Sequence, residues 1–375
     1  MGSPQRAVAY YCNRQVDLLS GRVSLIDINQ WIGQLREIKM SAAYKYPRVI
    51  HLFYEFAFLV EAQLKLLNVD SLLAIDIEYE TYREILPSKF PNKINLAKLS
   101  APNLENYTLA FEEGYQELLR GNCYQFNLTC PFRYSFKENY QAQDFIFSLW
   151  QQKKFRGAFA SATFIPYLNQ LFLSNSPECL FQYKNQTLSS MPIKGTLKRF
   201  EGKSWKPLWQ KLIRDKKSQA ELYMIADLLR NDLSRIELPR ARITLNKAPM
   251  LVPGLLHQYS QVDVELSNKV SLWRVIEKIF PGGSITGAPK VRAMRLIHQL
   301  ESRQRGFYCG SSLILFKKMK SASLNIRSAQ IDFTKKELIY QAGGGITLLS
   351  RVNDEFQEMI YKHDSFISTL TAHNC

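Results

Sequence analysis

Lys194 is the residue whose surroundings first indicate nucleophilic chemistry in this sequence. It follows a strand-like run over residues 187–193 and precedes a turn through Gly195 and Thr196. A lysine beside a β-branched residue and a tight turn can be held away from water, and desolvation lowers its pKa toward the neutral, nucleophilic amine. The simpler interpretation is an ordinary lysine at the end of a strand, pointing into solvent. The local pattern leaves both interpretations open.

A carboxylate comes within reach of this lysine if two strands form a hairpin. Glu178 precedes Lys194 by sixteen residues, and Asn185-Gln186 between them suits the turn. Across a hairpin such a pair is usually a surface ion pair worth less than about 1 kcal/mol. In a cleft, the same two side chains could serve as an acid and a nucleophile.

Three further carboxylates lie on two expected helices. One helix begins near Ser218, and Ser218 with Glu221 fits a capping box that by itself would explain both residues. In the last helix, Glu355, Glu358 and Lys362 share one face and could form a salt-bridged surface. Alternatively, the three carboxylates together could hold a hard divalent cation and leave positions free for the carboxylates of a substrate.

Two glycine-rich stretches could bring backbone close to a ligand. Residues 280–290 are typical of a loop that opens a helix, where free N–H groups could hold a carboxylate or a phosphate. This loop is not a phosphate loop, because Ala288 stands where the lysine of that motif would follow. The second stretch, Gly343, Gly344 and Gly345, lacks side chains that would keep a ligand away from the backbone.

The remaining pattern mixes helices and strands along the whole chain. Residues 1–105 give weak signals, and from residue 106 a helix to residue 120 is followed by a strand over residues 123–130. Residues 158–173 indicate two strands with a turn between them, and residues 322–331 indicate one continuous strand.

Composition limits the classes of protein to which this sequence can belong. With 375 residues, of which 46% are hydrophobic and 22% charged, the chain can bury a sizeable core. No apolar run approaches the ~20 residues that a membrane span needs. The six cysteines are scattered without a CxxC pair, so we expect a reduced, cytoplasmic setting and no zinc site.

The formal charge of +16 raises the question of a nucleic-acid partner. Between residues 184 and 217, ten Lys or Arg stand against two acids, in a segment that also contains glycine, proline and two tryptophans. A polyanion-binding face would place such residues on one helix or among stacking aromatics. We therefore expect a solvated loop or lid beside a site for a small anion, and no nucleic acid. A basic nucleic-acid-binding module is the alternative, and it would show salt-dependent affinity for any duplex.

Seven motifs in chain order resemble the chorismate-utilising enzymes, a family that includes anthranilate, aminodeoxychorismate, isochorismate and salicylate synthases. The resemblance covers about residues 106–363. The motifs that carry it are Pro192-Ile-Lys-Gly-Thr196, Ala220-Glu with Met224-Ile-Ala-Asp-Leu-Leu-Arg-Asn-Asp232, Phe280-Pro-Gly-Gly-Ser-Ile-Thr-Gly-Ala-Pro-Lys290, Tyr308-Cys-Gly-Ser311, Ile326-Arg327, Gly343-Gly-Gly-Ile346 and Glu355-x-x-Glu-x-x-x-Lys362. The resemblance implies an α+β fold of two face-packed β-sheets with helices outside, in an α/β/β/α arrangement. Residues 1–105 would be a short N-terminal portion of that fold, and residues 106–375 the chorismate-binding catalytic region.

Two positions resemble one branch of the family. Lys194 is similar to the lysine of the aminodeoxychorismate synthases, whereas anthranilate synthases have alanine there. The water-adding members have a lysine at the position of Gln125, where it acts as general base, and a neutral glutamine cannot take a proton from water. The resemblance thus implies amination of chorismate to 4-amino-4-deoxychorismate, in 4-aminobenzoate and folate biosynthesis. The alternative is anthranilate synthase component I.

The resemblance also implies roles for individual residues. Lys194 would add to ring carbon 2 while Glu178 protonates the hydroxyl that leaves carbon 4, giving a covalent intermediate that ammonia displaces. Magnesium (Mg²⁺) would be held by Glu221, Glu355 and Glu358. The substrate would be bound by the remaining predicted site residues, which are Gln125, Thr196, Tyr308, Arg327, Gly343, Gly344, Gly345 and Lys362.

The ammonia must come from another protein if this resemblance holds. Class I glutaminases share a Gly-x-Cys-x-Gly elbow, and none of the six cysteines lies in one. A separate glutaminase subunit is therefore implied. A catalytically inactive chorismate-binding protein is a further alternative, but the presence of Lys194, Glu178 and the three carboxylates argues against it.

Overall fold

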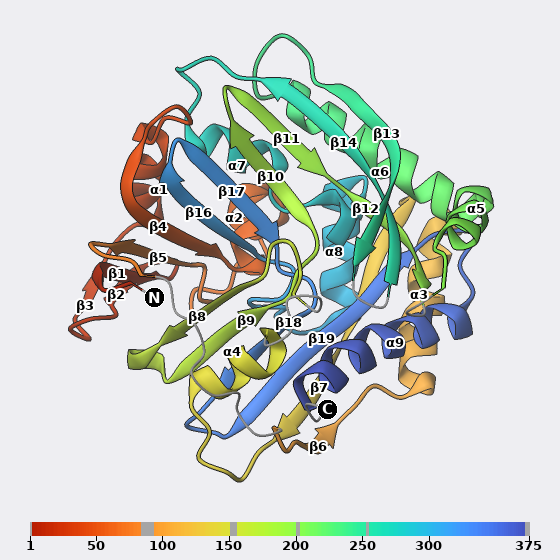
Figure 1. Ribbon diagram of the computed structural model, residues 1–375, viewed down its shortest axis with the longest axis horizontal. Helices are drawn as coiled ribbons and strands as arrows, with labels where there is room; N and C mark the ends of the chain where they lie inside the picture. Colours follow the sequence, from red (N-terminus) through yellow and green to blue (C-terminus); the bar gives the residue numbers. More distant parts are fainter. Residues whose placement is uncertain (1, 84–93, 151–155, 200–202, 253–254, 372–375) are drawn as a thin grey trace.

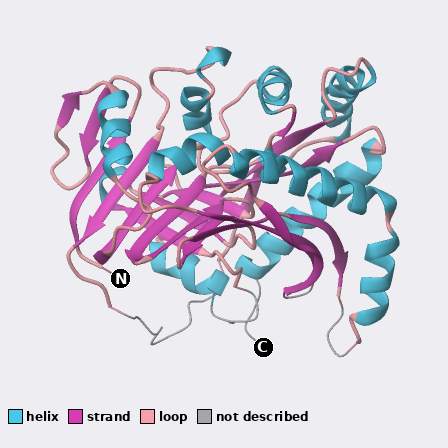
Figure 2. Ribbon diagram, turned by 90° about the horizontal axis from the view of Figure 1, so that it is seen from above, coloured by secondary structure: helices cyan, strands magenta, loops and turns pink. Residues whose placement is uncertain are grey.

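Two β-sheets with helices on their outer sides form the architecture of the computed structural model, which describes residues 2–83, 94–150, 156–199, 203–252 and 255–371 (Figure 1). Figure 2 shows the strands of both sheets lying between two sets of helices. The α+β class and the arrangement of two sheets with outer helices, expected from the sequence, are confirmed. Within the described part of the chain, no helix is both long enough and apolar enough to cross a membrane.

The helices cover the two sheets from opposite sides. The α-helices are α1 (Ile28–Glu37), α2 (Ala57–Val60), α3 (Leu104–Leu119), α4 (Ala142–Trp150), α5 (Lys206–Arg214), α6 (Lys216–Ser234), α7 (Leu272–Ile279), α8 (Lys290–Glu301) and α9 (Val352–Thr371). Short 3-10 turns are η1 (Tyr54–Phe56), η2 (Ala62–Leu64), η4 (Pro166–Leu168) and η5 (Gly283–Ile285).

The larger sheet combines strands from both halves of the chain. Its strands are β1 (Pro4–Tyr10), β2 (Arg14–Asp17), β3 (Val23–Leu25), β4 (Tyr44–Leu52), β5 (Ala74–Tyr79), β10 (Cys179–Lys184), β11 (Thr187–Met191), β12 (Ile193–Lys198), β13 (Arg242–Val252), β14 (Leu255–Glu265), β16 (Ser311–Lys317) and β17 (Met319–Leu324). Their order is β12-β14-β11-β10-β17-β16-β4-β5-β1-β2-β3, with β13 beside β14. The pairing of β4 with β16 joins the N-terminal strands to the part of the sheet that contains β12, the strand of Lys194.

The smaller sheet carries the glycine-rich strand. It consists of β6 (Ala97–Ser100), β7 (Gln125–Ser135), β8 (Ser161–Ile165), β9 (Gln170–Ser174), β15 (Gly287–Ala288), β18 (Ser328–Asp332) and β19 (Glu337–Ile346). The order is β15-β7-β19-β18-β9-β8, with β6 beside β7. Side chains alternate along β7, as strand geometry requires. Phe126 and Leu128 pack into the core with α3, α8 and α9, whereas Asn127 faces the other way.

Three hydrophobic clusters hold these layers together. One packs α1, α6 and α7 against the larger sheet, with Trp31 and Leu229 among its members. The second packs α3, α4, α8 and α9 against the smaller sheet. The third includes Phe53, which directly follows β4 of the larger sheet, and Phe172 in β9 of the smaller sheet. Their rings meet edge to face with centroids 5.3 Å apart. Because helices occupy the outer faces, the site must open between the sheets or at their edge.

Two strands expected from the sequence are each divided in the structure. A predicted site residue lies next to each division. Pro192 separates β11 from β12, since its nitrogen cannot donate to the ladder, so Lys194 lies inside β12 rather than at the end of one long strand. The expected strand over residues 322–331 is two strands, β17 and β18, in different sheets. Between them Arg327 adopts a left-handed backbone with φ of 50°.

Two local expectations on residues 203–234 are wrong. The N-cap of α6 is Asp215, whose carboxylate accepts a hydrogen bond from the Ser218 amide at 2.8 Å, so Ser218 and Glu221 do not form the expected capping box. Glu221 is therefore not needed to cap the helix. The segment expected to be a solvated loop or lid contains the helix α5, which has Pro207 in its first turn and buries Leu212, so it is not an irregular loop throughout.

Candidate active site

A cavity of about 820 Å³ brings the predicted site residues together from both sheets. Its walls come from β12, β19, η5, α5, α6 and α9, and from the connection between β17 and β18. With the exception of Gln125, every residue assigned to the site from the sequence lines this cavity. They are Glu178, Lys194, Thr196, Glu221, Tyr308, Arg327, Gly343, Gly344, Gly345, Glu355, Glu358 and Lys362.

An irregularity in β12 turns Lys194 into the cavity. Lys194 pairs with Gln258 of β14 and Thr196 pairs with His257, so Gly195 is the extra residue of a bulge. Gly195 has a φ of +75°, and a Cβ there would lie 2.9 Å from Leu212, so only glycine fits. The Lys194 side chain is 11% exposed, and its Nζ lies 3.8 Å from Oε2 of Glu221. The lysine therefore does not point into solvent.

Glu178 is buried just before β10, at 4% exposure. Ser284 of η5 donates a hydrogen bond to its Oε1 at 2.6 Å. Burial raises the pKa of Glu178, although the Ser284 hydrogen bond and the charges of Lys194, Lys362 and Arg327 act in the opposite direction. The carboxyl group consequently keeps its proton to a higher pH than an exposed glutamate, which is the property that a general acid needs.

Lys217 places an ammonium group between two of the predicted metal ligands. Its Nζ donates to Oε1 of Glu355 and lies 3.7 Å from Oε1 of Glu221. Burial lowers the pKa of Lys217, but the two carboxylates outweigh burial and raise it. Burial also raises the pKa of Glu221, whose Oε1 accepts no hydrogen bond from the described residues. This part of the cavity is therefore built to hold positive charge.

The residues fit a magnesium ion in their chemistry. Among the described residues, no three His, Cys, Asp or Glu side chains are already grouped as a metal cluster. Glu221 on α6 and Glu355 on α9 nevertheless both contact the ammonium group of Lys217. The Oε1 of Glu221 accepts no hydrogen bond from the described residues and can still bind a cation. Carboxylate oxygens are the ligands that magnesium prefers. Together with Glu358, these two could hold the ion once the ammonium of Lys217 moves aside.

Lys362 connects the last helix to the glycine-rich strand. Its Nζ donates to the carbonyl oxygen of Gly343 at 2.8 Å and pairs with Oε1 of Glu358, also at 2.8 Å. The ammonium of Lys362 lowers the pKa of Glu358 to about 2. Gly344 stands beside the carboxylates, because a Cβ there would lie 3.2 Å from Oε2 of Glu355. The glycine-rich strand thus lies directly against the carboxylates of α9.

His257 links two of the predicted substrate-binding residues. Burial, together with Arg327, lowers the pKa of His257 to about 3, so its ring is neutral near pH 7. Arg327 Nη2 lies 3.3 Å from Nε2 of His257, and a guanidinium can only donate, so Nε2 accepts and Nδ1 carries the proton. Nδ1 then donates to the hydroxyl of Thr196 at 2.9 Å. This leaves the Thr196 hydroxyl hydrogen free to donate to a substrate.

Gln125 lies behind the cavity wall rather than in it. Its side chain is fully buried, and neither amide atom has a hydrogen-bond partner among the described residues. A Cβ on Gly345 would lie 2.6 Å from Nε2 of Gln125 and 3.2 Å from Nζ of Lys194. The missing side chain of Gly345 therefore lets an uncharged amide and the candidate nucleophile approach each other.

Several cavity residues were not assigned from the sequence. Ser284 lies in one of the seven motifs but had no expected role, and the sequence left open whether His257 is functional or structural. Lys217 lies one helical turn before Glu221, a spacing that could have suggested an ion pair. Lys211 and Arg214 of α5 line the cavity, although their segment was expected to be a loop.

Comparisons with known proteins agree with this geometry. The family model described as "chorismate binding enzyme" matches residues 33–368. Aminodeoxychorismate synthase component 1 of Salmonella typhimurium is 31% identical over 326 residues, which cover 84% of this chain and 69% of that protein. The protein of the same name from Escherichia coli is 32% identical over 273 residues, covering 71% of this chain and 58% of that protein.

The solved structures support the same fold. Anthranilate synthase component I from Streptococcus pneumoniae superposes with a TM-score of 0.78 over 97% of this chain and 90% of that one, at 19% identity. At this identity the likeness concerns the fold alone. The family match and the curated relatives therefore carry the assignment beyond the fold.

Proposed function

The chain belongs to the family of chorismate-binding enzymes, and from this we propose that it transfers ammonia to chorismate in a magnesium-dependent reaction that yields 4-amino-4-deoxychorismate. The observation that carries the proposal is that Lys194 and Glu178 line one cavity, with the Lys194 side chain 11% exposed. A lysine held there can act as a nucleophile, and a buried carboxyl group can act as an acid. The product would serve 4-aminobenzoate and folate biosynthesis.

In the first step, the amine of Lys194 forms a bond to ring carbon 2 while the double bonds shift and the C–O bond at carbon 4 breaks. Glu178 gives its proton to the departing hydroxyl group, which leaves as water. The new ammonium at the lysine nitrogen returns a proton to the Glu178 carboxylate. The enzyme then carries the ring as a secondary amine on Lys194.

In the second step, ammonia forms a bond to carbon 4 and the bond between carbon 2 and the lysine nitrogen breaks. Glu178 protonates the lysine nitrogen as it leaves and takes a proton back from the newly bound ammonium group. The two steps together convert chorismate and ammonia into 4-amino-4-deoxychorismate and water. Gln125 cannot take a proton from water, which supports ammonia rather than water as the incoming nucleophile.

The cavity offers separate positions for the two carboxylates of chorismate. Arg327, Tyr308 and Thr196 line the cavity, and Thr196 has a free hydroxyl hydrogen. These three would bind the enolpyruvyl carboxylate. Backbone N–H groups near Gly344, together with Lys362, would complete that clamp. Magnesium held by Glu221, Glu355 and Glu358 would supply the positive charge that binds and orients the ring carboxylate.

The test is an assay of the purified chain with chorismate, magnesium and ammonium salt. Products are identified by mass after chromatography against both standards. The chromatographic step is needed because 4-amino-4-deoxychorismate and its 2-amino isomer have the same mass. The proposal expects the 4-amino product. Anthranilate would instead identify an anthranilate synthase component I, and isochorismate would identify a water-adding enzyme.

A second arm replaces the ammonium salt with glutamine. Because none of the cysteines lies in a glutaminase elbow, the chain alone should turn over with ammonium and not with glutamine. Adding a separate glutaminase subunit should restore turnover with glutamine. Turnover with glutamine in the absence of a second protein would contradict the proposed partner.

A further inference from the structure

Arg305 is a fully buried cation on the far side of the cavity wall, at 1% exposure. Its Nη1 donates to the carbonyl oxygen of Ile285 at 2.8 Å, and its Nη2 donates to the carbonyl oxygen of Asn127 at 2.7 Å. Ile285 and Asn127 both line the cavity, the first in η5 and the second in β7. One guanidinium therefore ties together two segments of the wall.

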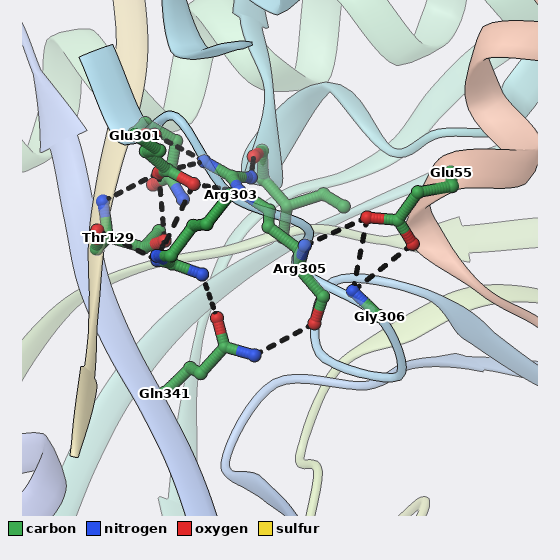
Figure 3. A network of polar contacts seen from close by, with 9 residues as sticks. Glu55, Thr129, Glu301, Arg303, Arg305, Gly306 and Gln341 are labelled. Carbon is green, nitrogen blue, oxygen red and sulfur yellow. Dashed lines mark hydrogen bonds and ion pairs between the residues drawn. The ribbon is translucent and has the colours of Figure 1, made fainter. Parts of the chain in front are cut away.

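The charge of this guanidinium is balanced inside the protein. Arg305 Nε and Nη2 donate to the two oxygens of Glu301 at 2.9 and 2.7 Å. Glu301 also accepts hydrogen bonds from the amide and hydroxyl of Thr129 in β7, at 2.9 and 2.8 Å. Figure 3 shows Arg303 beside this pair, reaching Gln341 of β19. The ion pair is thus anchored to both central strands of the smaller sheet.

The backbone of Arg305 is held as firmly as its side chain. Glu55, in η1 of the N-terminal region, accepts hydrogen bonds from the Arg305 amide at 2.8 Å and from the Gly306 amide at 3.1 Å. Gln341, which lines the cavity, donates to the Arg305 carbonyl oxygen at 2.8 Å. Figure 3 shows Arg305 between Glu55 on one side and Glu301 on the other. The backbone of Arg305 is thus held by contacts that are separate from those of its guanidinium.

The residue next to Ile285 is Ser284, which donates to Glu178 at 2.6 Å. The Ile285 carbonyl lies in the peptide unit that joins Ile285 to Thr286, and only the Cα of Ile285 separates this unit from the planar peptide that begins at Ser284. A shift of this carbonyl is therefore passed to Ser284 within the short turn η5. We propose that Arg305 is a positioning residue of the active site, which holds η5 so that Ser284 keeps Glu178 in place. This inference rests on the proposed function, in which Glu178 is the acid.

Lysine is the informative replacement for Arg305. It keeps the charge that balances Glu301, but its single ammonium cannot reproduce the planar fork that reaches both carbonyl groups and the carboxylate. Glu55→Gln is the matched control, since it weakens the same network at the Arg305 backbone and leaves every contact of the guanidinium unchanged. Both variants should lower the melting temperature, so stability alone does not separate them.

The first measurement needs no substrate. Hydrogen–deuterium exchange is followed in peptides that cover residues 280–289, in the wild type and the two variants. Arg305→Lys should speed exchange in this segment by about tenfold or more, as expected when a local opening loses over 1.4 kcal/mol. Glu55→Gln should leave it close to wild type. Wild-type exchange at residues 280–289 in Arg305→Lys overturns the inference, whether or not the enzyme acts on chorismate.

The second measurement is the pH profile of turnover. The charged groups that face Glu178 are Lys194 of β12, Lys362 of α9 and Arg327, and none of them is changed. Ser284→Ala and Arg305→Lys should both move the high-pH limb upward, because each removes or misplaces the hydrogen bond that favours the ionised acid. We expect a fall in kcat of about 100-fold for Arg305→Lys, as for a misplaced catalytic group.

The double variant Ser284→Ala/Arg305→Lys distinguishes positioning from general destabilisation. If Arg305 acts through Ser284, the double variant shifts the limb no further than Ser284→Ala alone, and additive shifts overturn the inference. If Arg305→Lys does not fold, the variant Arg305→Met/Glu301→Gln replaces it in the exchange measurement, in the pH profile and in the combination with Ser284→Ala. This variant removes both buried charges together. A wild-type chain that does not aminate chorismate overturns the proposed function, while the exchange measurement still decides the role of Arg305.

Discussion

Lys194 Nζ lies 3.8 Å from Oε2 of Glu221, and both side chains are 11% exposed. The proposed nucleophile is therefore ion-paired with a carboxylate that is also a proposed magnesium ligand. One carboxylate cannot serve fully as the counter-ion of an ammonium group and as the ligand of a divalent cation. Removing the counter-ion from an ammonium group favours its neutral form. The nucleophile and the metal site are thus electrostatically coupled.

The first prediction concerns the carboxylates on α9. Glu358→Gln should weaken magnesium binding by at least about tenfold, a loss that is typical even for outer partners of a metal site. Turnover at a fixed magnesium concentration should fall with it. Isothermal titration with magnesium measures the affinity, and thermal unfolding checks the fold. Glu112→Gln, an exposed residue on α3, is the control. Wild-type magnesium affinity in Glu358→Gln would remove this residue from the metal site.

A second prediction follows from the position of Lys217. Its ammonium contacts Glu355 and lies 3.7 Å from Glu221, so it competes with any metal ion for the same oxygens. Lys217→Ala should therefore bind magnesium more tightly than the wild type in the absence of substrate. The neighbouring Lys216→Ala, an exposed residue of the same helix, should bind it as the wild type does. Weaker binding in Lys217→Ala would show that the lysine supports the metal site instead.

The third prediction uses the raised pKa of Glu178. Burial raises the pKa of Glu178 above its value in the unfolded chain. The protonated carboxyl group therefore contributes fully to the free energy of unfolding below the ordinary carboxyl pKa of about 4.3. This contribution is lost as the pH rises through the raised pKa of the folded protein. Glu178→Gln imitates the neutral form. The variant should therefore gain stability relative to the wild type as the pH increases, by at most about 1.4 kcal/mol per pH unit.

Thermal unfolding between pH 5 and pH 9 tests this sign. The same variant should lose turnover by about 100-fold or more at every pH, because an amide cannot act as a general acid. A difference in melting temperature that is constant with pH would mean that the carboxyl group is ionised throughout this range. Glu112→Gln again serves as the exposed control.

The sequence predicted which residues lie together in the cavity but not how they are held. Each predicted site residue except Gln125 lines one cavity, because the motifs already contain the side chains that must meet there. The break at Pro192 was readable from its missing N–H group, yet the run looked continuous in its apolar pattern. The division of residues 322–331 between two sheets was not readable, because strand periodicity does not reveal a change of partner.

The contacts that support the site were also beyond the sequence. Ser284 and Glu178 are separated by 106 residues, and the side chain of Arg305 reaches Asn127 over 178 residues. Such pairs depend on how two sheets pack, which no local pattern contains. The capping box expected at Ser218 shows that a local motif can also mislead. Ser218 and Glu221 match the motif in sequence, but Asp215 is the residue that caps the helix.

The fourth prediction concerns the cations of α5. Lys211 and Arg214, in the last turn of α5, line the cavity and form no ion pair with another described residue, so their charge can attract a dianionic substrate. Changing both to glutamine should lower kcat/KM severalfold at low ionic strength, and the difference should shrink toward 0.5 M salt. Lys206→Gln, on the same helix but outside the cavity, should change little. An effect independent of salt would contradict electrostatic attraction.

The last prediction concerns Lys194 itself. If it is the covalent nucleophile, chorismate and magnesium without ammonia should leave a ring adduct on this lysine, detectable in the intact protein by mass spectrometry. Lys194→Ala should abolish the adduct, whereas Lys184→Ala, an exposed lysine at the end of β10, should retain it. Lys217 is a second cavity amine beside Glu221, at 3.7 Å, so loss of the adduct in Lys194→Ala is what identifies Lys194 as the residue that carries it.

The product of Lys194→Ala is the sharper outcome. The family resemblance implies an alanine at the matching position of anthranilate synthases, where ammonia would attack carbon 2 directly. Without the lysine, the space beside carbon 2 is open to ammonia, and any remaining turnover should shift from 4-amination toward 2-amination and anthranilate. Chromatography against both standards separates the two products. Unaltered 4-amination by Lys194→Ala would show that the lysine forms no bond to the ring, while the magnesium and acid assignments would still be tested by Glu358→Gln and Glu178→Gln.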